Sequence, residues 1–91
     1  MTRDEINRKI SEIRNEWTLL NDGEWVPCDW GLPVNVLTLL KEMPAPYLWL
    51  NPDTSWTLEF ELPAGEFDFV NATSVEAAIC EAWLKWKKET S

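Results

Sequence analysis

The sequence contains no histidine, only two cysteines and only three glycines. A structural zinc site needs a full set of cysteine or histidine ligands, so this chain alone cannot build one. Without histidine, no Cys-His or Ser-His pair can activate a nucleophile, and no glycine-rich loop is present to hold a phosphate. We therefore expect a non-enzymatic protein with no cofactor and no metal ion.

Long apolar runs are also missing. No stretch approaches the roughly 18 apolar residues of a membrane span, and the opening residues, MTRDEINRK, are polar rather than typical of a signal peptide. We expect a cytoplasmic protein with no membrane contact, in which both thiols stay reduced. Cys80 lies beside an apolar helical stripe and is expected to be buried. Cys28, next to Asp29, is expected to be more exposed but unreactive.

Basic residues are scarce through the middle of the chain, and the formal net charge is −8. Residues 15–84 hold a single base, Lys41, against twelve acids, whereas both ends are slightly positive. A field of this sign repels phosphate backbones and anionic lipids, so direct binding to nucleic acid or to a membrane is not expected. The acidity either favours a basic protein partner or serves solubility alone.

The length, residues 1–91, predicts a single domain, and seven tryptophans supply bulk for a small core. The fold class is α+β in the order α-α-β-β-β-α, with a three-stranded antiparallel sheet and helices packed on its apolar face. The first helix is expected to end between Trp17 and Leu20, and residues 21–33 to form a loop or a short hairpin arm. Capping-box spacings and apolar periodicity predict helices that begin near Thr2, Pro33 and Thr73 and strands at 47–50, 55–62 and 66–70.

The strands at 55–62 and 66–70 both alternate between apolar and polar residues. Keeping all their apolar side chains on one face requires a hairpin loop with an even number of residues. Like charges directly opposite each other on the other face are unfavourable by roughly 0.2–1 kcal/mol per pair. The apolar set expected to face the core is Trp56, Leu58, Phe60, Leu62, Phe67 and Phe69. The carboxylates expected to share the opposite face are Glu59, Glu61, Glu66 and Asp68.

This acidic face has three interpretations. It is a surface for a basic partner protein, a weak divalent-cation site, or a solvated face that tolerates its own repulsion. The cation site is disfavoured, because such sites usually add backbone ligands from a dedicated loop. The first interpretation is the main functional hypothesis.

The tryptophans supply the alternative hypothesis. Trp83 lies on the predicted core stripe of the last helix, and we expect it to be mostly buried against Phe60 and Phe67 or their neighbours. Three others fall outside helices and are either anchors for a ligand or a lid over the small core. As anchors they would suit a small-ligand binder, for example a nucleotide sponge. These three are Trp25, Trp30 and Trp49.

Three stretches of sequence resemble the phage ABA sandwich domain, a family of small proteins of Bacillus phages and prophages. MTRDEINRKISEI resembles the opening helix of the family, and DWGLPVNVLTLLKEM is similar to its second helix with the preceding Asp and Trp. NATSVEAAICEAWLKW resembles its closing turn and helix. The resemblance implies the fold and a phage or prophage origin, with expression in a bacterial cytoplasm. It transfers no activity to particular residues, which is consistent with an accessory protein that binds a host or phage protein.

Overall fold

A computed structural model describes residues 2–90. Within them the chain forms helices and two antiparallel sheets, so the predicted α+β fold with its three-stranded antiparallel sheet is confirmed. The additional two-stranded sheet is a hairpin arm between the first two helices. The elements are α1 (Arg3–Arg14), β1 (Trp17–Leu19), β2 (Trp25–Pro27), α2 (Pro33–Glu42), β3 (Tyr47–Leu50), β4 (Trp56–Glu61), β5 (Phe67–Ala72) and α3 (Val75–Thr90).

Helix α1 begins as predicted but ends early. The Thr2 side chain accepts a hydrogen bond from the Glu5 backbone N–H at 3.2 Å, which satisfies a free donor of the first turn. Asn15 adopts the left-handed conformation at φ 56 and its N–H bonds to the Ser11 carbonyl, which ends the helix. The prediction that the helix continues to Trp17 is therefore wrong, and Trp17 is a half-buried residue of β1.

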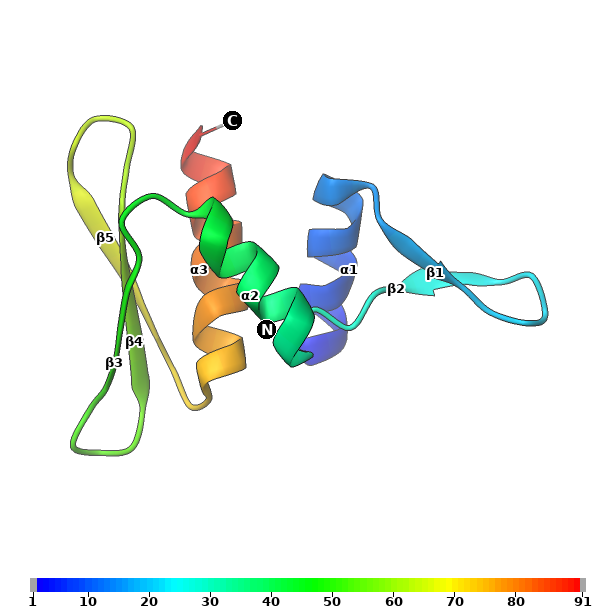
Figure 1. Cartoon of the computed structure of the whole chain (residues 1–91), viewed down its shortest axis with the longest axis horizontal. Helices are drawn as coiled ribbons and strands as arrows, with labels where there is room; N and C mark the ends of the chain where they lie inside the picture. The colour runs from blue at the N-terminus through cyan, green and yellow to red at the C-terminus, as the bar shows by residue number, and fades with distance from the viewer. Residues whose placement is uncertain (1, 91) are drawn as a thin grey trace.

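The elements stack in layers that Figure 1 shows from the side. The sheet β3–β4–β5 lies at one end, α3 packs on one of its faces, and α1 and α2 pack against α3. Trp83 of α3 is fully buried in the same core cluster as Phe60, so its predicted burial is confirmed. Cys80 is also buried, as predicted, with 3% of its surface exposed.

The β4–β5 hairpin closes through a loop of three residues, Pro63-Ala64-Gly65. The Leu62 N–H donates to the Glu66 carbonyl at 2.7 Å, and the Gly65 N–H donates to the Leu62 carbonyl at 2.9 Å. Gly65 has φ +86, a conformation that glycine adopts without strain. The odd number of loop residues reverses the orientation of every β5 side chain relative to an even loop.

This reversal overturns the predicted orientation of the two β5 phenylalanines. Glu61 lies opposite Phe67, and Glu59 lies opposite Phe69, so each ring shares a face with a glutamate. Phe67 and Phe69 are 57% and 55% exposed instead of packed in the core. Of the two rings named for Trp83, Phe60 therefore lies in its core cluster and Phe67 does not.

Candidate functional site

One face of the three-stranded sheet points away from α3, and we call it the outer sheet face. The opposite face holds the fully buried Leu58 and Phe60, which pack in the core cluster with α3. Because side chains alternate along each strand, the residues between these belong to the outer sheet face. They are Tyr47, Trp49, Thr57, Glu59, Glu61, Phe67, Phe69 and Asn71.

The strand register places a carboxylate between two aromatic rings. Glu59 lies opposite Tyr47 on β3 and opposite Phe69 on β5, so one row across the sheet is aromatic, acidic and aromatic. Directly opposite side chains in antiparallel strands are close enough to contact one another. Tyr47 also lies beside Trp49 on β3, with ring centroids 5.2 Å apart and planes tilted by 51°. Tyr47 is 65% exposed, so much of this aromatic surface faces solvent.

A shallow hollow of about 590 Å³ adjoins these rings. The Asn51 side chain organises its floor: it accepts a hydrogen bond from the Trp49 indole N–H at 2.9 Å and donates to Thr57 Oγ1 at 2.7 Å. Thr57 in turn donates to Asn71. These bonds fix the Trp49 ring and leave the polar groups of the floor satisfied. The hollow is lined by Trp49, Asn51, Pro52, Asp53, Ser55, Thr57, Glu59, Phe69 and Asn71.

The outer sheet face is acidic without a compensating base. Residues 42–84 contain no lysine or arginine, so none lies on the three strands. Within residues 2–90, neither Glu59 nor Glu61 has an ion pair or a side-chain hydrogen bond. At the rim, hydrogen bonds from the Ser55 hydroxyl and backbone N–H hold the pKa of Asp53 below its ordinary value. Unpaired carboxylates beside exposed rings are suited to a cation that stacks on an aromatic face, above all a guanidinium group.

The predicted cluster of four carboxylates on one face does not form. Asp68 lies opposite Phe60, on the side of the sheet that α3 covers, and it accepts a hydrogen bond from the Lys85 ammonium at 3.0 Å. This bond holds the pKa of Asp68 below its ordinary value. Glu66 lies just before β5, two residues ahead of Asp68. Its side chain is therefore expected on the same side of the sheet as that of Asp68. Only Glu59 and Glu61 remain on the outer sheet face.

Two signals for this arrangement were present in the sequence. A glycine at the third position of a short loop, as in Pro63-Ala64-Gly65, is typical of three-residue hairpins with an odd register. Lys85 is one of the few bases after residue 41, so an acid on the covered face had a partner available. The exposed rings of Phe67 and Phe69 are the functional candidates that periodicity alone assigned to the core.

Trp30 is not a ligand anchor. It is 2% exposed, and its indole N–H donates to the buried Ser11 hydroxyl at 3.0 Å. The same hydroxyl accepts the Cys28 N–H at 3.1 Å, so Ser11 ties the loop that follows β2 to α1. Satisfying the indole N–H in this way allows a large amphipathic side chain to enter the core.

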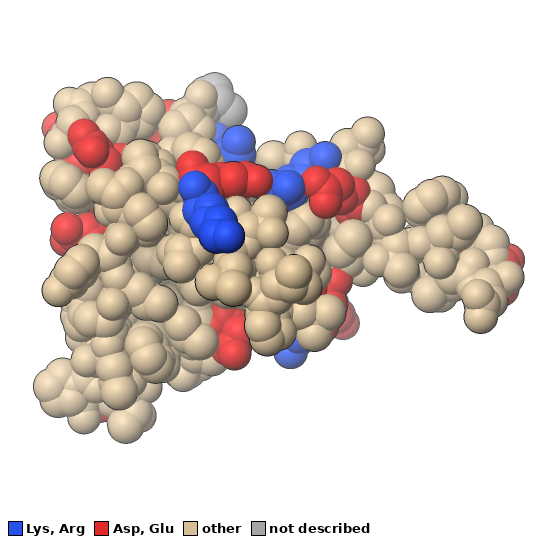
Figure 2. All heavy atoms as spheres, in the orientation of Figure 1, with Lys and Arg blue, Asp and Glu red and all other residues tan. Residues whose placement is uncertain are grey.

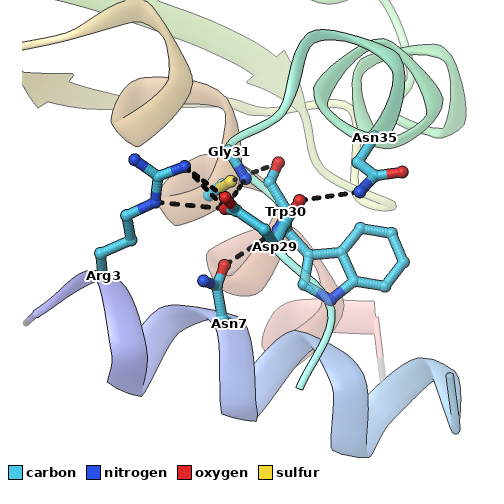
Figure 3. Close-up of polar contacts among 7 residues, drawn as sticks. Arg3, Asn7, Asp29, Trp30, Gly31 and Asn35 are labelled. Carbon is cyan, nitrogen blue, oxygen red and sulfur yellow. Dashed lines mark hydrogen bonds and ion pairs between the residues drawn. The ribbon is translucent and has the colours of Figure 1, made fainter. Parts of the chain in front are cut away.

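The residues around Trp30 form a polar clamp that has a structural role, shown in Figure 3. The Arg3 guanidinium donates to both carboxylate oxygens of Asp29 at 2.7 Å, and hydrogen bonding by Arg3 holds the pKa of Asp29 below its ordinary value. The Asp29 carboxylate also accepts the Gly31 N–H at 3.1 Å. A Cβ at position 31 would lie 2.9 Å from the Arg3 Nη2 atom, so a larger residue there would shift the end of the Arg3 side chain. Asn7 accepts the Trp30 N–H at 3.0 Å and completes the link to α1.

Trp25 and Trp49 lie far apart. Trp25 is 63% exposed on β2 in the hairpin arm, whereas Trp49 lies on β3 at the other end of the molecule, as Figure 1 shows. Together with the burial of Trp30, this separation means that the three tryptophans do not form one binding site. The small-ligand hypothesis therefore loses the feature on which it was based.

A second hollow of about 400 Å³ lies between α1, the β5–α3 turn and α3. Its one base is Arg3, which is already paired with Asp29, and Glu76 and Glu81 also line it. It therefore offers no net positive charge to an anion. Across residues 2–90 no three Cys, Asp or Glu side chains gather as a metal site would require. None of the helices described is long and apolar enough to span a bilayer.

Comparison with known proteins gives no relative. No family model, no curated protein and no solved structure matches the chain. The outer sheet face must therefore be interpreted from its own geometry and charge.

Proposed function

We propose that this protein is a non-enzymatic accessory protein that binds a basic partner protein through the outer sheet face. The observation that carries the proposal is the row Tyr47, Glu59 and Phe69, in which an unpaired carboxylate lies between two exposed rings. Exposed aromatic clusters of this kind are costly in water unless a partner covers them. Aromatic residues are also the side chains that most often dominate binding energy at protein interfaces.

Arginine side chains of the partner fit this surface best. A guanidinium group can donate two parallel hydrogen bonds to the Glu59 carboxylate while its plane stacks on a neighbouring ring. Each charge-assisted hydrogen bond contributes about 1.5–3 kcal/mol, and stacking on an exposed ring adds about 0.5–1 kcal/mol. Glu61 lies two residues further along the same strand and offers a second position roughly 7 Å away. A partner segment with arginine at alternate positions of a strand would match this spacing.

The partner we propose is a host or phage protein of a bacterial cytoplasm. This part of the proposal rests on the resemblance to the phage ABA sandwich domain in the opening helix, the DWG-containing stretch and the closing helix.

A lysate capture with paired variants tests the proposal. The immobilised protein would be exposed to bacterial lysate and eluted with rising salt, because exposed charge pairs weaken as salt screens them. The test variant is Glu59→Gln with Glu61→Gln. The control is Glu66→Gln with Glu76→Gln, which removes the same charge from exposed positions outside the outer sheet face.

The expected result is a basic protein that wild type and the control retain and that the test variant loses. Phe69→Ala should weaken retention as well, because it removes a ring from the same row. Equal retention by all variants, or no specific protein retained at low salt, would contradict the proposal.

A further inference from the structure

We propose that the hairpin arm of β1 and β2 docks onto the exposed side of α2 in a second copy of this chain, reciprocally, to form a symmetric dimer. The arm projects away from the helices, and its tip lies far from the rest of the molecule (Figure 1). Leu19 and Trp25 lie directly opposite each other in the hairpin and share one face. They are 54% and 63% exposed, and Leu20 at the base of the turn is 42% exposed.

The arm has little to stabilise it in a single copy. An isolated two-stranded hairpin is marginally stable in water, and this one packs mainly against α1, through β2. Its apolar side chains contribute nothing to the core cluster. A covering surface would therefore both hide the apolar face and fix the arm in place.

Helix α2 offers the complementary surface. Val36 and Leu39 face the core, while Val34 and Leu37 face solvent with exposed fractions of 70% and 52%. Leu32, just before the helix, is 47% exposed and extends this patch. Figure 2, in the orientation of Figure 1, shows mostly uncharged atoms over the middle of α2, with charged atoms near both of its ends.

Charge identifies a second copy as the occupant. The arm carries Asp22 and Glu24 at its tip, and residues 15–40 contain no base. The exposed stripe of α2 ends at Lys41, four residues after Leu37, and Lys41 has no ion pair within the described residues. The arm thus joins an apolar patch to a negatively charged tip, and α2 joins an apolar patch to a positively charged residue. Lys41 is the base within α2, and this same chain presents the acids Asp22 and Glu24 on its arm.

The area is sufficient for a specific dimer when both arms dock. A reciprocal contact about a twofold axis uses each patch twice. Five half-exposed apolar side chains per copy, namely Leu19, Trp25, Leu32, Val34 and Leu37, each bury on the order of 80–100 Å², which supplies on the order of 1,000 Å² in total, the lower bound for a specific interface. Affinity in the micromolar range is expected for an interface of this size. The outer sheet face lies on the far side of the sheet and stays free, so the dimer presents two copies of it.

Sedimentation of the whole protein over a concentration series through the micromolar range tests the dimer. Wild type should shift from monomer to dimer. Two variants should remain monomeric: Leu19→Ser with Trp25→Ser in the arm, and Val34→Ser with Leu37→Ser on α2. Phe67→Ser with Phe69→Ser is the matched control, because it removes equally exposed apolar side chains from the outer sheet face and should still dimerise. Circular dichroism checks that each variant is folded.

Mixing the arm variant with the α2 variant tests the identity of the contact. Only the mixed pair restores one intact arm against one intact α2, so the mixture should dimerise weakly while each variant alone does not. Lys41→Glu should weaken the wild-type dimer, and Asp22→Lys with Glu24→Lys in the same chain should restore it. A monomeric wild type throughout the series, a dimer that survives both serine variants, or a mixture that behaves like its components would overturn the inference.

Discussion

Glu59 lies directly opposite Phe69 across the β4–β5 ladder, and both side chains project from the uncovered face of the sheet. This pairing replaces the repulsion of two carboxylates with a carboxylate beside a ring. A surface of carboxylates alone would attract any cation, whereas under the proposed function a carboxylate between Tyr47 and Phe69 would favour cations that also stack. The proposed function follows from this one register.

Truncation of Trp83 is predicted to cost more stability than that of any exposed tryptophan. Trp83 is fully buried, and its indole N–H donates to Glu42 at 3.0 Å. Trp83→Ala should lower the free energy of unfolding by about 3–5 kcal/mol, because it leaves a large cavity and an unpaired acceptor. Trp25→Ala, measured in dilute protein, should change it by less than about 0.5 kcal/mol. Urea unfolding monitored by circular dichroism compares them, and similar losses would contradict the described core.

Ser11 is predicted to contribute more to the stability of the fold than the small size of its side chain suggests. Its buried hydroxyl accepts hydrogen bonds from the Trp30 indole and from the Cys28 N–H. Ser11→Ala leaves both donors without a partner and should cost about 1–3 kcal/mol. Lys9→Ala, an exposed change on the same helix, should be nearly neutral. Equal stability of the two variants would show that the hydroxyl does not hold the loop.

The fold was predictable where local signals act alone. The start of α1 follows from the Thr2 and Glu5 capping pair, and the strands follow from alternation. The end of α1 was missed because Asn15 stops the helix through its left-handed conformation, while the apolar spacing continues to Trp17. An asparagine at that point was the available signal.

The candidate site was harder to predict because it depends on one loop residue. Gly65 closes an odd loop, and this single choice moves Phe67 and Phe69 to the outer sheet face and Asp68 to the covered side. The burial of Trp30 depends on side chains of α1 that are distant in sequence, and periodicity carries no information about such partners.

Low pH should reduce the free energy of unfolding, because it protonates the Asp68 carboxylate that Lys85 stabilises. The pKa of Asp68 is lowered in the folded protein by the hydrogen bond from Lys85, from an ordinary value of 3.8. The unfolded chain therefore takes up this proton first as pH falls. The stabilisation is complete above pH 3.8 and is lost as pH falls through the lower folded-state pKa.

Because the pair is partly exposed, Asp68→Asn should cost about 0.5–1 kcal/mol at neutral pH. The cost should vanish in strong acid. Glu66→Gln, which removes an exposed charge that has no ion pair within residues 2–90, is the control. Unfolding free energies measured from neutral to acidic pH provide the test. A constant difference between Asp68→Asn and wild type across that range would argue against the Lys85 pair.

The two cysteines should differ in reactivity. Burial raises the pKa of the Cys80 thiol to about 12, and its Sγ lies 3.5 Å from the Trp30 carbonyl oxygen. Cys28 is only half-buried, and both cysteines are free. A thiol reagent should modify Cys28 in the native protein and Cys80 only after unfolding, with two thiols counted in denaturant. Fast modification of both in the native state, or a count of none without reductant, would be inconsistent with this structure.

The most direct test of the outer sheet face is a nuclear magnetic resonance titration of isotope-labelled protein with a synthetic peptide that carries arginine at alternate positions. Backbone shifts should change along β3, β4 and β5 at the residues that flank Glu59, Glu61 and Phe69, and the changes should shrink as salt is added. A lysine peptide of the same spacing should bind more weakly, because ammonium groups form no bidentate stacked contact. Glu59→Gln with Glu61→Gln should abolish the changes. Shifts that map to α2 or the arm, or that persist in this variant, would contradict the account.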